Sequence, residues 1–262
     1  MEKLVIIGGG NMGAAILSGI KGQYSIILCE KDSQKARTLK KKYGVQLGDF
    51  CSAIERSSII LLAVKPQDFE DVLSHLREHN HGGKKLIISI AAGITTQYIE
   101  KRLGKGVRVI RCMPNLPLLI GQGMTAFCAG RWATKKDLQS VAGIFKKVGQ
   151  VVFVQEKWMN AVTAVSGSGP AYVFLFVECF LKAAKKLGFD EKQSKQLVIQ
   201  TLKGSLELLE KSSDSPQVLR SKVTSKGGTT QAAMDVFLRS KIDKIFEVAL
   251  KAAAKRAKEL AK

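Results

Sequence analysis

The stretch Leu4-Val5-Ile6-Ile7-Gly8-Gly9-Gly10-Asn11-Met12-Gly13 decides the fold of the first half of the chain. Its apolar residues predict a buried strand, and the residues after Gly10 begin an apolar helix. In the Gly-x-Gly-x-x-Gly pattern between them, Gly8 permits a tight turn, Gly10 lets a pyrophosphate approach the backbone, and Gly13 lets the helix pack on the sheet. Free N–H groups at the helix N-terminus attract that anion. We therefore predict a dinucleotide site, with an ordinary glycine-rich turn as the alternative.

The remainder of the first half alternates short apolar runs with amphipathic, lysine-rich stretches. This alternation is typical of βαβ units and a parallel sheet. The patterns predict strands over residues 4–7, 25–29, 59–64, 86–90, 107–111, 124–129 and 151–154. They predict helices over residues 12–21, 34–43, 67–79, 96–103 and 134–147.

After about residue 156 the strand pattern disappears, and apolar residues recur at helical spacing. The expected helices cover residues 171–187, 191–209, 216–223, 230–238 and 242–260. A chain of 262 residues is also long enough for two cores. We therefore predict an α/β Rossmann-type N-terminal domain over residues 1–156, followed by an all-α C-terminal domain over residues 157–262.

Lysine and arginine number 42 against 22 aspartate and glutamate residues, which gives a formal net charge of +20. This excess favours anionic partners such as dinucleotides, carboxylates or nucleic acids. No recognised nucleic-acid module accompanies the charge. We therefore expect a small-molecule substrate and no specific nucleic-acid partner.

The chain has five cysteines, Cys29, Cys51, Cys112, Cys128 and Cys179. Their odd number and the lack of a Cys-x-x-Cys pair argue against a disulfide framework and against a thiolate zinc site. The apolar stretch that follows Lys3 is too short for the core of a signal peptide. We therefore expect reduced thiols and a cytoplasmic location.

Residues 161–177 carry no charge, and a membrane-spanning helix needs about 20 mainly apolar residues. The sequence Ser166-Gly167-Ser168-Gly169-Pro170 interrupts this stretch. Pro170 suits the first turn of a helix, where a missing N–H breaks no helical bond. We expect no membrane span, and a helix over residues 171–181 that is buried in a core or a subunit interface.

An acidic residue about 20 positions after the first glycine commonly binds the ribose of a dinucleotide. Glu30 stands at this place, at the end of the second predicted strand. Its carboxylate would bind the 2′-hydroxyl of NADH and repel the 2′-phosphate of NADPH. Lys31 could pair with that phosphate and favour NADPH, and both side chains could also be simply solvated. The residues leave the preference open.

Two further strand ends carry small residues. Ala63-Val64-Lys65-Pro66 ends one strand, and Pro66 forces an extended backbone just before it. Ser89-Ile90-Ala91-Ala92-Gly93 ends the next. Ligands of open α/β sheets lie at this edge. We predict that the nicotinamide half lies against these backbones; strand-to-helix turns that only need small residues are the alternative.

A second glycine-rich helix start, Ser225-Lys226-Gly227-Gly228-Thr229-Thr230, precedes a helical pattern over residues 231–238. The N–H groups of Gly228, Thr229 and Thr230, with the helix dipole, suit a small carboxylate. The threonine hydroxyls can hydrogen-bond a neighbouring polar atom. A simple threonine cap is the alternative.

Several motifs together resemble the pyrroline-5-carboxylate reductase family. They are Gly8-Gly9-Gly10-Asn11-Met12-Gly13, Val64-Lys65-Pro66-Gln67, Arg111-Cys112-Met113-Pro114-Asn115, Ser166-Gly167-Ser168-Gly169-Pro170-Ala171-Tyr172 and Val223-Thr224-Ser225-Lys226-Gly227-Gly228-Thr229-Thr230. Their order and spacing match along nearly the whole chain. The resemblance implies an NAD(P)H-dependent oxidoreductase that reduces the C=N bond of 1-pyrroline-5-carboxylate to L-proline, the last step of proline biosynthesis.

The resemblance also implies roles for individual residues. The pyrophosphate would be held by Gly8, Gly10, Asn11, Met12 and Gly13. The nicotinamide half would be flanked by Ala63, Val64, Lys65, Pro66 and Ala91. The substrate carboxylate would be bound by the backbone of Gly227, Gly228 and Thr229, in the same loop as Ser225. The hydroxyl of Thr230, the catalytic group, would lie near the ring nitrogen, and the helical domain would form a homodimer or a larger homo-oligomer.

Two positions depart from the family pattern. Lys226 stands where the family usually has proline, which loosens the turn but adds a cation beside the proposed carboxylate site. Glu30-Lys31 stands where the family commonly shows a polar residue followed by arginine. The resemblance therefore favours NADPH, whereas Glu30 favours NADH.

Three alternatives remain. A related imine or β-hydroxyacid reductase would use a lysine acid, for which Lys182, Lys185 and Lys186 are available by position only. A non-catalytic NAD(P)-binding regulator would tolerate the loss of the turn proline. His75-Leu76-Arg77-Glu78-His79, close to His81, fits an inverted zinc-protease pattern. A solvated helix explains these histidines, and we expect no metal.

Overall fold

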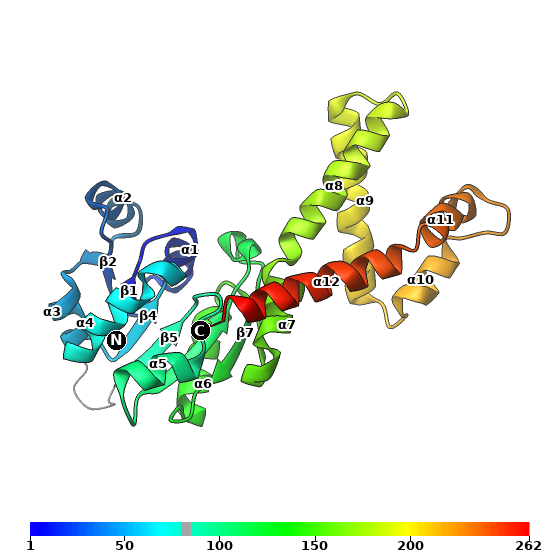
Figure 1. Ribbon diagram of the computed structural model, residues 1–262. Helices are drawn as coiled ribbons and strands as arrows, with labels where there is room; N and C mark the ends of the chain where they lie inside the picture. The colour runs from blue at the N-terminus through cyan, green and yellow to red at the C-terminus, as the bar shows by residue number, and fades with distance from the viewer. Residues whose placement is uncertain (80–84, 262) are drawn as a thin grey trace. The chain divides into compact units, whose positions relative to one another are not determined.

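The computed structural model describes residues 1–79 and 85–261. The chain divides into two compact units, Met1–Pro170 with Ala252–Lys262, and Ala171–Lys251, here called the sheet unit and the helical unit. Figure 1 shows the elements of each. The last helix, α12 (Ile242–Glu259), begins in the helical unit and ends in the sheet unit. The domain boundary that we expect after residue 156 stays a prediction.

Within the described residues, eight strands form one sheet in the order β3-β2-β1-β4-β5-β6-β7-β8. The strands are β1 (Lys3–Ile7), β2 (Ser25–Cys29), β3 (Gln46–Leu47), β4 (Ile59–Leu62), β5 (Leu86–Ser89), β6 (Arg108–Met113), β7 (Gly123–Ala129) and β8 (Gly149–Phe153). Strands β1 to β6 are all parallel. The predicted Rossmann-type fold is therefore confirmed.

The last two strands correct the expectation of a fully parallel sheet. Strand β7 runs antiparallel to β6, and β8 runs parallel to β7. A parallel crossover needs a dozen or more residues, usually a helix. The segment between β6 and β7 is short and contains only the 3-10 helix η2 (Leu116–Ile120). The longer path through α6 (Lys135–Phe145) restores a parallel pairing.

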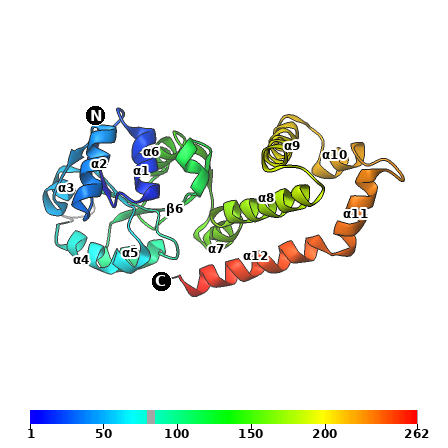
Figure 2. The same cartoon turned by 90° about the horizontal axis from the view of Figure 1, so that it is seen from above.

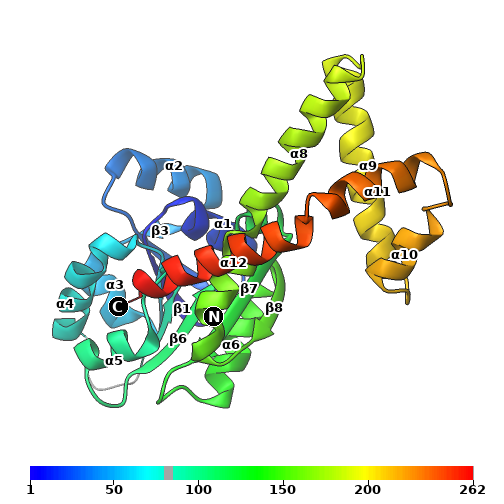
Figure 3. The ribbon, with the colours of Figure 1, turned by 45° about the vertical axis from the view of Figure 1, so that its right-hand side comes forward.

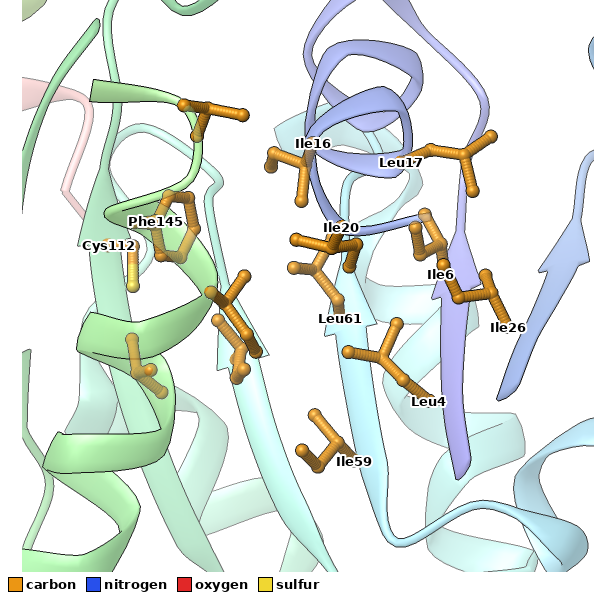
Figure 4. Close-up of a cluster of buried hydrophobic side chains, with 14 of the residues drawn as sticks. Leu4, Ile6, Ile16, Leu17, Ile20, Ile26, Ile59, Leu61, Cys112 and Phe145 are labelled. Atoms are coloured by element: carbon orange, nitrogen blue, oxygen red, sulfur yellow. The ribbon is translucent and has the colours of Figure 1, made fainter. Parts of the chain in front are cut away.

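Helices cover both faces of the sheet (Figure 2). One face carries α1 (Asn11–Ile20), α2 (Ser33–Tyr43) and α6, and the other carries α3 (Phe50–Arg56), α4 (Phe69–His79) and α5 (Thr96–Leu103). Figure 4 shows Leu4 and Ile6 of β1 packed in the first layer near Ile20 of α1. Val5 and Ile7 point to the opposite layer. Burial of both faces explains why the strands are continuous apolar runs.

The short β3 and α3 were not expected from the sequence. A strand of two residues and a helix of seven are too short to show a periodic pattern. One local signal does mark α3, because the Asp49 side chain accepts a hydrogen bond from the Ser52 N–H and caps the helix.

Residues 156–261 form helices and turns only, as predicted. The helices are η3 (Glu156–Trp158), α7 (Met159–Val162), the π-helix η4 (Thr163–Gly167), α8 (Gly169–Lys186), α9 (Glu191–Lys211), α10 (Pro216–Lys222), α11 (Thr229–Arg239) and α12; a further 3-10 helix, η1 (Pro66–Asp68), precedes α4. The predicted all-α second part is confirmed.

The expected interruption at residues 166–170 takes the form of a change in helix type. Residues 163–167 form a π-helix, Ser168 is a bend and α8 begins at Gly169, all within the helical span Glu156–Lys186. Pro170 lies in the first turn of α8, as predicted. By length and composition alone this span could cross a membrane. The absence of a membrane span therefore stays a prediction.

Candidate cofactor and substrate sites

The glycines of the loop after β1 differ in their surroundings. Gly8 has φ +99°, and a Cβ there would lie 2.7 Å from the Ala63 carbonyl oxygen. A Cβ on Gly13 would lie 2.2 Å from the Gly8 carbonyl oxygen. Around Gly10, no described atom lies within 4 Å of such a Cβ. The fold therefore requires Gly8 and Gly13, whereas Gly10 leaves room for a ligand against the backbone.

A cavity of about 840 Å³ opens at the carboxyl ends of β1, β2 and β4. Its volume lies in the range of small-molecule sites, about 300–1,000 Å³. The predicted cofactor residues that line it are Gly8, Gly10, Glu30, Lys31, Ala63, Val64 and Lys65. The others lie elsewhere: Asn11, Met12 and Gly13 in the first turn of α1, Pro66 at the start of η1, and Ala91 buried after β5.

The loops after β1, β4 and β5 stand side by side. The Ala63 N–H donates to the Ile7 carbonyl at 2.8 Å, and the Ile90 N–H donates to the Leu62 carbonyl at 3.2 Å. These bonds continue the strand register past the strand ends. The turn that contains Ala91 is therefore next in line after Ala63 along the edge where open α/β sheets bind ligands.

The Glu30 side chain is turned toward the glycine-rich loop. Its Oε2 accepts the Gly9 N–H at 2.7 Å, its Oε1 accepts the Asp32 N–H at 3.0 Å, and Lys35 Nζ lies 3.5 Å from Oε2. Burial alone would raise the pKa of Glu30, but the two N–H groups and Lys35 outweigh it and lower the pKa. Glu30 therefore presents a negative charge at neutral pH.

The Lys31 ammonium group, next to Glu30 in the sequence, is paired with the Asp68 carboxylate. Its Nζ lies 3.2 Å from Asp68 Oδ1, and the side chain is 84% exposed. Further carboxylates on the cavity wall belong to Asp32, Asp49 and Asp71. The cavity wall thus carries both the carboxylates of Glu30, Asp32, Asp49, Asp68 and Asp71 and the cations of Lys31, Lys35 and Lys65.

Several wall residues were missed by sequence reasoning. They are Gly48, Asp49 and Phe50 around the start of α3, and Asp71, Val72 and His75 on α4. The rings of Phe50 and His75 meet edge to face at 5.7 Å. The Asp49 cap was the available signal, but the pairing of α3 with α4 depends on the tertiary fold.

The histidines are held by local contacts. His75 Nδ1 lies 2.8 Å from the Asp71 carbonyl oxygen, and His79 Nδ1 lies 3.6 Å from a Glu55 carboxylate oxygen. His81 lies outside the described residues. Among residues 1–79 and 85–261, no three histidine, cysteine, aspartate or glutamate side chains cluster as metal ligands.

The predicted substrate residues come together at the start of α11, in the helical unit. The Gly228 N–H donates to the Ser225 carbonyl at 3.0 Å, and Gly227 has φ +72°. These features define a type II turn with Lys226 at its second position, where proline is favoured. The turn closes without proline, and the expectation that Lys226 loosens it relative to proline stays a prediction.

The start of α11 offers backbone donors to a ligand. Gly228 is the N-cap, and no described side chain caps the N–H groups of the first turn. Thr229 and Thr230 are the first two residues of the helix. This arrangement suits a small carboxylate. Whether this turn meets the cofactor cavity stays a prediction.

Two of the motifs in the sheet unit contact each other. Asn115 Nδ2 donates to the Ser166 carbonyl oxygen at 3.3 Å, and Asn115 Oδ1 accepts the Met124 N–H at 2.8 Å. A Cβ on Gly167 would lie 2.5 Å from Met113 Cε. The small residues of the second motif therefore let the π-helix approach the end of β6.

The lysines considered as acids for a different reductase lie on α8. Lys182 Nζ lies 2.6 Å from Glu178 and Lys185 Nζ lies 3.1 Å from Glu191, in exposed ion pairs. The hydrogen bond that Lys182 donates to the Glu178 carboxylate raises the pKa of Lys182. Nothing in these contacts favours proton transfer by a lysine.

Comparison with known proteins identifies the family. Residues 156–260 match the family described as pyrroline-5-carboxylate reductase dimerisation, and residues 3–93 match the family described as NADP oxidoreductase, coenzyme F420-dependent. The pyrroline-5-carboxylate reductase of Mycobacterium leprae is 35% identical over 99% of this chain and 97% of its own. This chain belongs to the pyrroline-5-carboxylate reductase family. The resemblance seen in the motifs is confirmed.

Solved structures agree with this assignment. A pyrroline-5-carboxylate reductase from Coxiella burnetii has a TM-score of 0.92 at 35% identity and covers 99% of this chain and 98% of its own. The pyrroline carboxylate reductase of Plasmodium falciparum, solved with NADP bound, has a TM-score of 0.88 at 30% identity and covers 100% and 98%. The family thus includes a member seen with a phosphorylated dinucleotide.

Proposed function

We propose that the chain reduces 1-pyrroline-5-carboxylate to L-proline with NAD(P)H as the hydride donor, as the last step of proline biosynthesis. The observation that carries the proposal is the cavity behind the glycine-rich loop, lined by Gly8, Gly10 and Glu30, in a chain of this family. No observation favours the imine, β-hydroxyacid or regulator alternatives.

The dinucleotide would be held by the sheet unit. The N–H groups at the start of α1, with Asn11 and Met12, would bind the pyrophosphate, which can approach at Gly10. The nicotinamide half would lie against Ala63–Pro66 and Ala91. When bound, the reduced dinucleotide supplies a hydride to the imine carbon.

The substrate would be held by the helical unit. The backbone of Gly227, Gly228 and Thr229 would bind the carboxylate, beside Ser225 and the cation of Lys226. The Thr230 hydroxyl would hydrogen-bond the ring nitrogen and hold its proton. A protonated C=N bond is already electrophilic, so orientation of the two ligands supplies most of the catalysis.

NADH is the cofactor that we infer to be preferred. Glu30 is ionised and fixed by two N–H groups, and Lys31 is paired with Asp68. A 2′-phosphate entering beside Glu30 would be repelled by its carboxylate, whereas a ribose hydroxyl could donate to the carboxylate. The pyrroline carboxylate reductase of Plasmodium falciparum was solved with NADP bound, so at least one family member binds the phosphorylated form.

The chain would act as a homodimer. The match to a dimerisation family supports this, as do the exposed apolar side chains of α8, among them Phe174 and Phe176. Either a second copy of the chain or a membrane could cover this apolar face. The match to the dimerisation family favours the second copy. A cytoplasmic location belongs to the same proposal, because all five cysteines are free.

The test is a cofactor-oxidation assay with 1-pyrroline-5-carboxylate, with NADH and NADPH in parallel and proline identified as the product. We expect turnover with both cofactors and a larger kcat/KM with NADH. No proline with either cofactor would refute the proposed reaction. A larger kcat/KM with NADPH would refute only the preference.

A further inference from the structure

Both ends of the region that matches the dimerisation family contact the connection between β5 and α5. Glu156 and Leu260 are its first and last residues, and both lie in the sheet unit. Leu260 contacts Gly93 in this connection, and Glu156 contacts Thr96, the first residue of α5. The inference below rests on the proposed function, because we place the nicotinamide half of the dinucleotide at the same connection.

Glu156 holds the start of α5. Its Oε2 accepts the Thr96 hydroxyl at 2.8 Å and the Thr96 N–H at 3.4 Å, and its Oε1 accepts Arg111 Nη1 at 2.6 Å. Arg111 is only 2% exposed, and the Cys128 thiol also donates to Oε2 at 3.2 Å. Charge-assisted bonds are shorter and stronger than neutral ones and fix geometry, and here the Arg111 partner is buried. Glu156 is thus a rigid link between the helical region and α5.

Leu260 lies against the other side of the connection. A Cβ on Gly93 would lie 2.6 Å from the Leu260 carbonyl oxygen and 3.5 Å from the Ala261 nitrogen. The atoms that this Cβ would meet belong to the backbone of Leu260 and Ala261. Gly93 also has φ +77°, which a side chain would strain. Ala257, one turn earlier on α12, is buried and anchors this end of the helix. Figure 3 shows the end of α12 near α5.

Two hydrogen bonds and burial hold the backbone of the connection between these two contacts. The Ala91 N–H donates to Ser89 Oγ at 3.3 Å, and the Ile94 N–H donates to the Ala91 carbonyl at 3.5 Å. Ala91 itself is 3% exposed. A displacement of Glu156 or Leu260 would therefore reach the backbone of Ala91, since close-packed interiors transmit strain.

We propose that Glu156 and the last turn of α12 are positioning elements that hold the β5–α5 connection in the conformation that receives the nicotinamide half of the dinucleotide. Because α12 begins in the helical unit, the affinity for that half depends on the dimerisation region. The adenosine half, bound at the cavity after β1 and β2, does not depend on it.

Two variants test the proposal, Glu156→Gln and Gly93→Ala, each titrated with NADH and with ADP-ribose. ADP-ribose carries the adenosine and pyrophosphate but lacks nicotinamide. We expect NADH affinity to fall at least about fivefold and ADP-ribose affinity to change less than about twofold, because a misplaced connection affects only the nicotinamide half. Retained ADP-ribose binding also shows that the variants are folded.

Two matched variants control for lost packing. Asp137→Asn breaks a buried pair with Arg108 on β6, where Asp137 also accepts the N–H and hydroxyl of Thr134, as Glu156 does those of Thr96. Gly121→Ala places a side chain at φ +74°, where no described atom lies within 4 Å. Both controls should leave the ratio of NADH to ADP-ribose affinity unchanged.

Failure of the positioning role and failure of the proposed function give different results. If the test variants weaken NADH and ADP-ribose equally, or weaken neither, the positioning role is overturned. If the unaltered chain binds neither NADH nor NADPH, the proposed function itself fails.

Discussion

Glu30 is the residue that we expect to determine the preference between NADH and NADPH. Its carboxylate accepts the Gly9 N–H at 2.7 Å while it lines the cavity. Glu30→Gln removes the charge and keeps the size. We expect the ratio of kcat/KM for NADH to that for NADPH to fall about tenfold, equivalent to about 1.4 kcal/mol. Steady-state kinetics with both cofactors measure this ratio.

A control separates this local effect from net charge. Glu207→Gln removes an exposed carboxylate on α9 that is paired with Lys211. It should leave the cofactor ratio unchanged. An equal shift in both variants would show that Glu30 does not select the cofactor.

Acid should remove the stabilisation that Glu30 provides. Because its pKa is lowered in the folded chain, its contribution is complete above the unfolded value, about 4.3, and is lost as pH falls through the lower folded value. The difference in melting temperature between the unaltered chain and Glu30→Gln should therefore shrink from about pH 5 to about pH 3. Thermal unfolding over this range checks it; a constant difference would contradict it.

The turn before α11 is the element that we expect to bind the substrate carboxylate, and its backbone conformation can be tested by substitution. Lys226 occupies the second position of a type II turn, and no described acceptor takes its N–H. Lys226→Pro should therefore raise the free energy of unfolding by about 0.4–1 kcal/mol. Loss of the cation should raise the KM for pyrroline-5-carboxylate more than the KM for NADH, with activity retained.

The variant Lys226→Ala separates the two effects. It removes the same cation without restricting the turn, so it should raise the substrate KM without stabilising the fold. Denaturant unfolding and initial-rate kinetics give both quantities. A larger change in the NADH KM than in the substrate KM would refute the assignment of this turn to the substrate.

At the scale of the whole molecule, α8 exposes an apolar face in the single chain. Phe174, Phe176 and Phe180 are 57%, 44% and 41% exposed, and the rings of Phe176 and Phe180 meet edge to face at 6.0 Å. Burial of one such side chain stabilises an interface by about 1.5–3 kcal/mol. Phe176→Glu should therefore weaken the dimer, and sedimentation equilibrium should show a larger dissociation constant.

The matched control is Lys203→Glu, an exposed residue of α9. It changes charge without removing apolar surface, so the dimer should persist. A dimer of unchanged stability in Phe176→Glu would place the interface elsewhere. An unaltered chain that sediments as a monomer would contradict the proposed dimer.

Local sequence patterns were sufficient to predict much of this fold. The strand over residues 4–7, the glycines that follow and the first turn of α1 lie where the sequence predicts them. The second half is helical as its periodicity indicates, and Gly228 is the N-cap of α11. These features depend on neighbouring residues, because strand burial, helix periodicity and positive φ are set within a few positions.

Contacts between distant residues required the tertiary structure. The direction of β7 depends on the short return after Met113, and α3 adds Phe50 to the cavity wall. The Glu156 side chain reaches Thr96 across 60 positions of sequence. No local pattern encodes which carboxylate meets which hydroxyl, because those pairings follow from how the packed elements bring remote side chains within hydrogen-bonding distance.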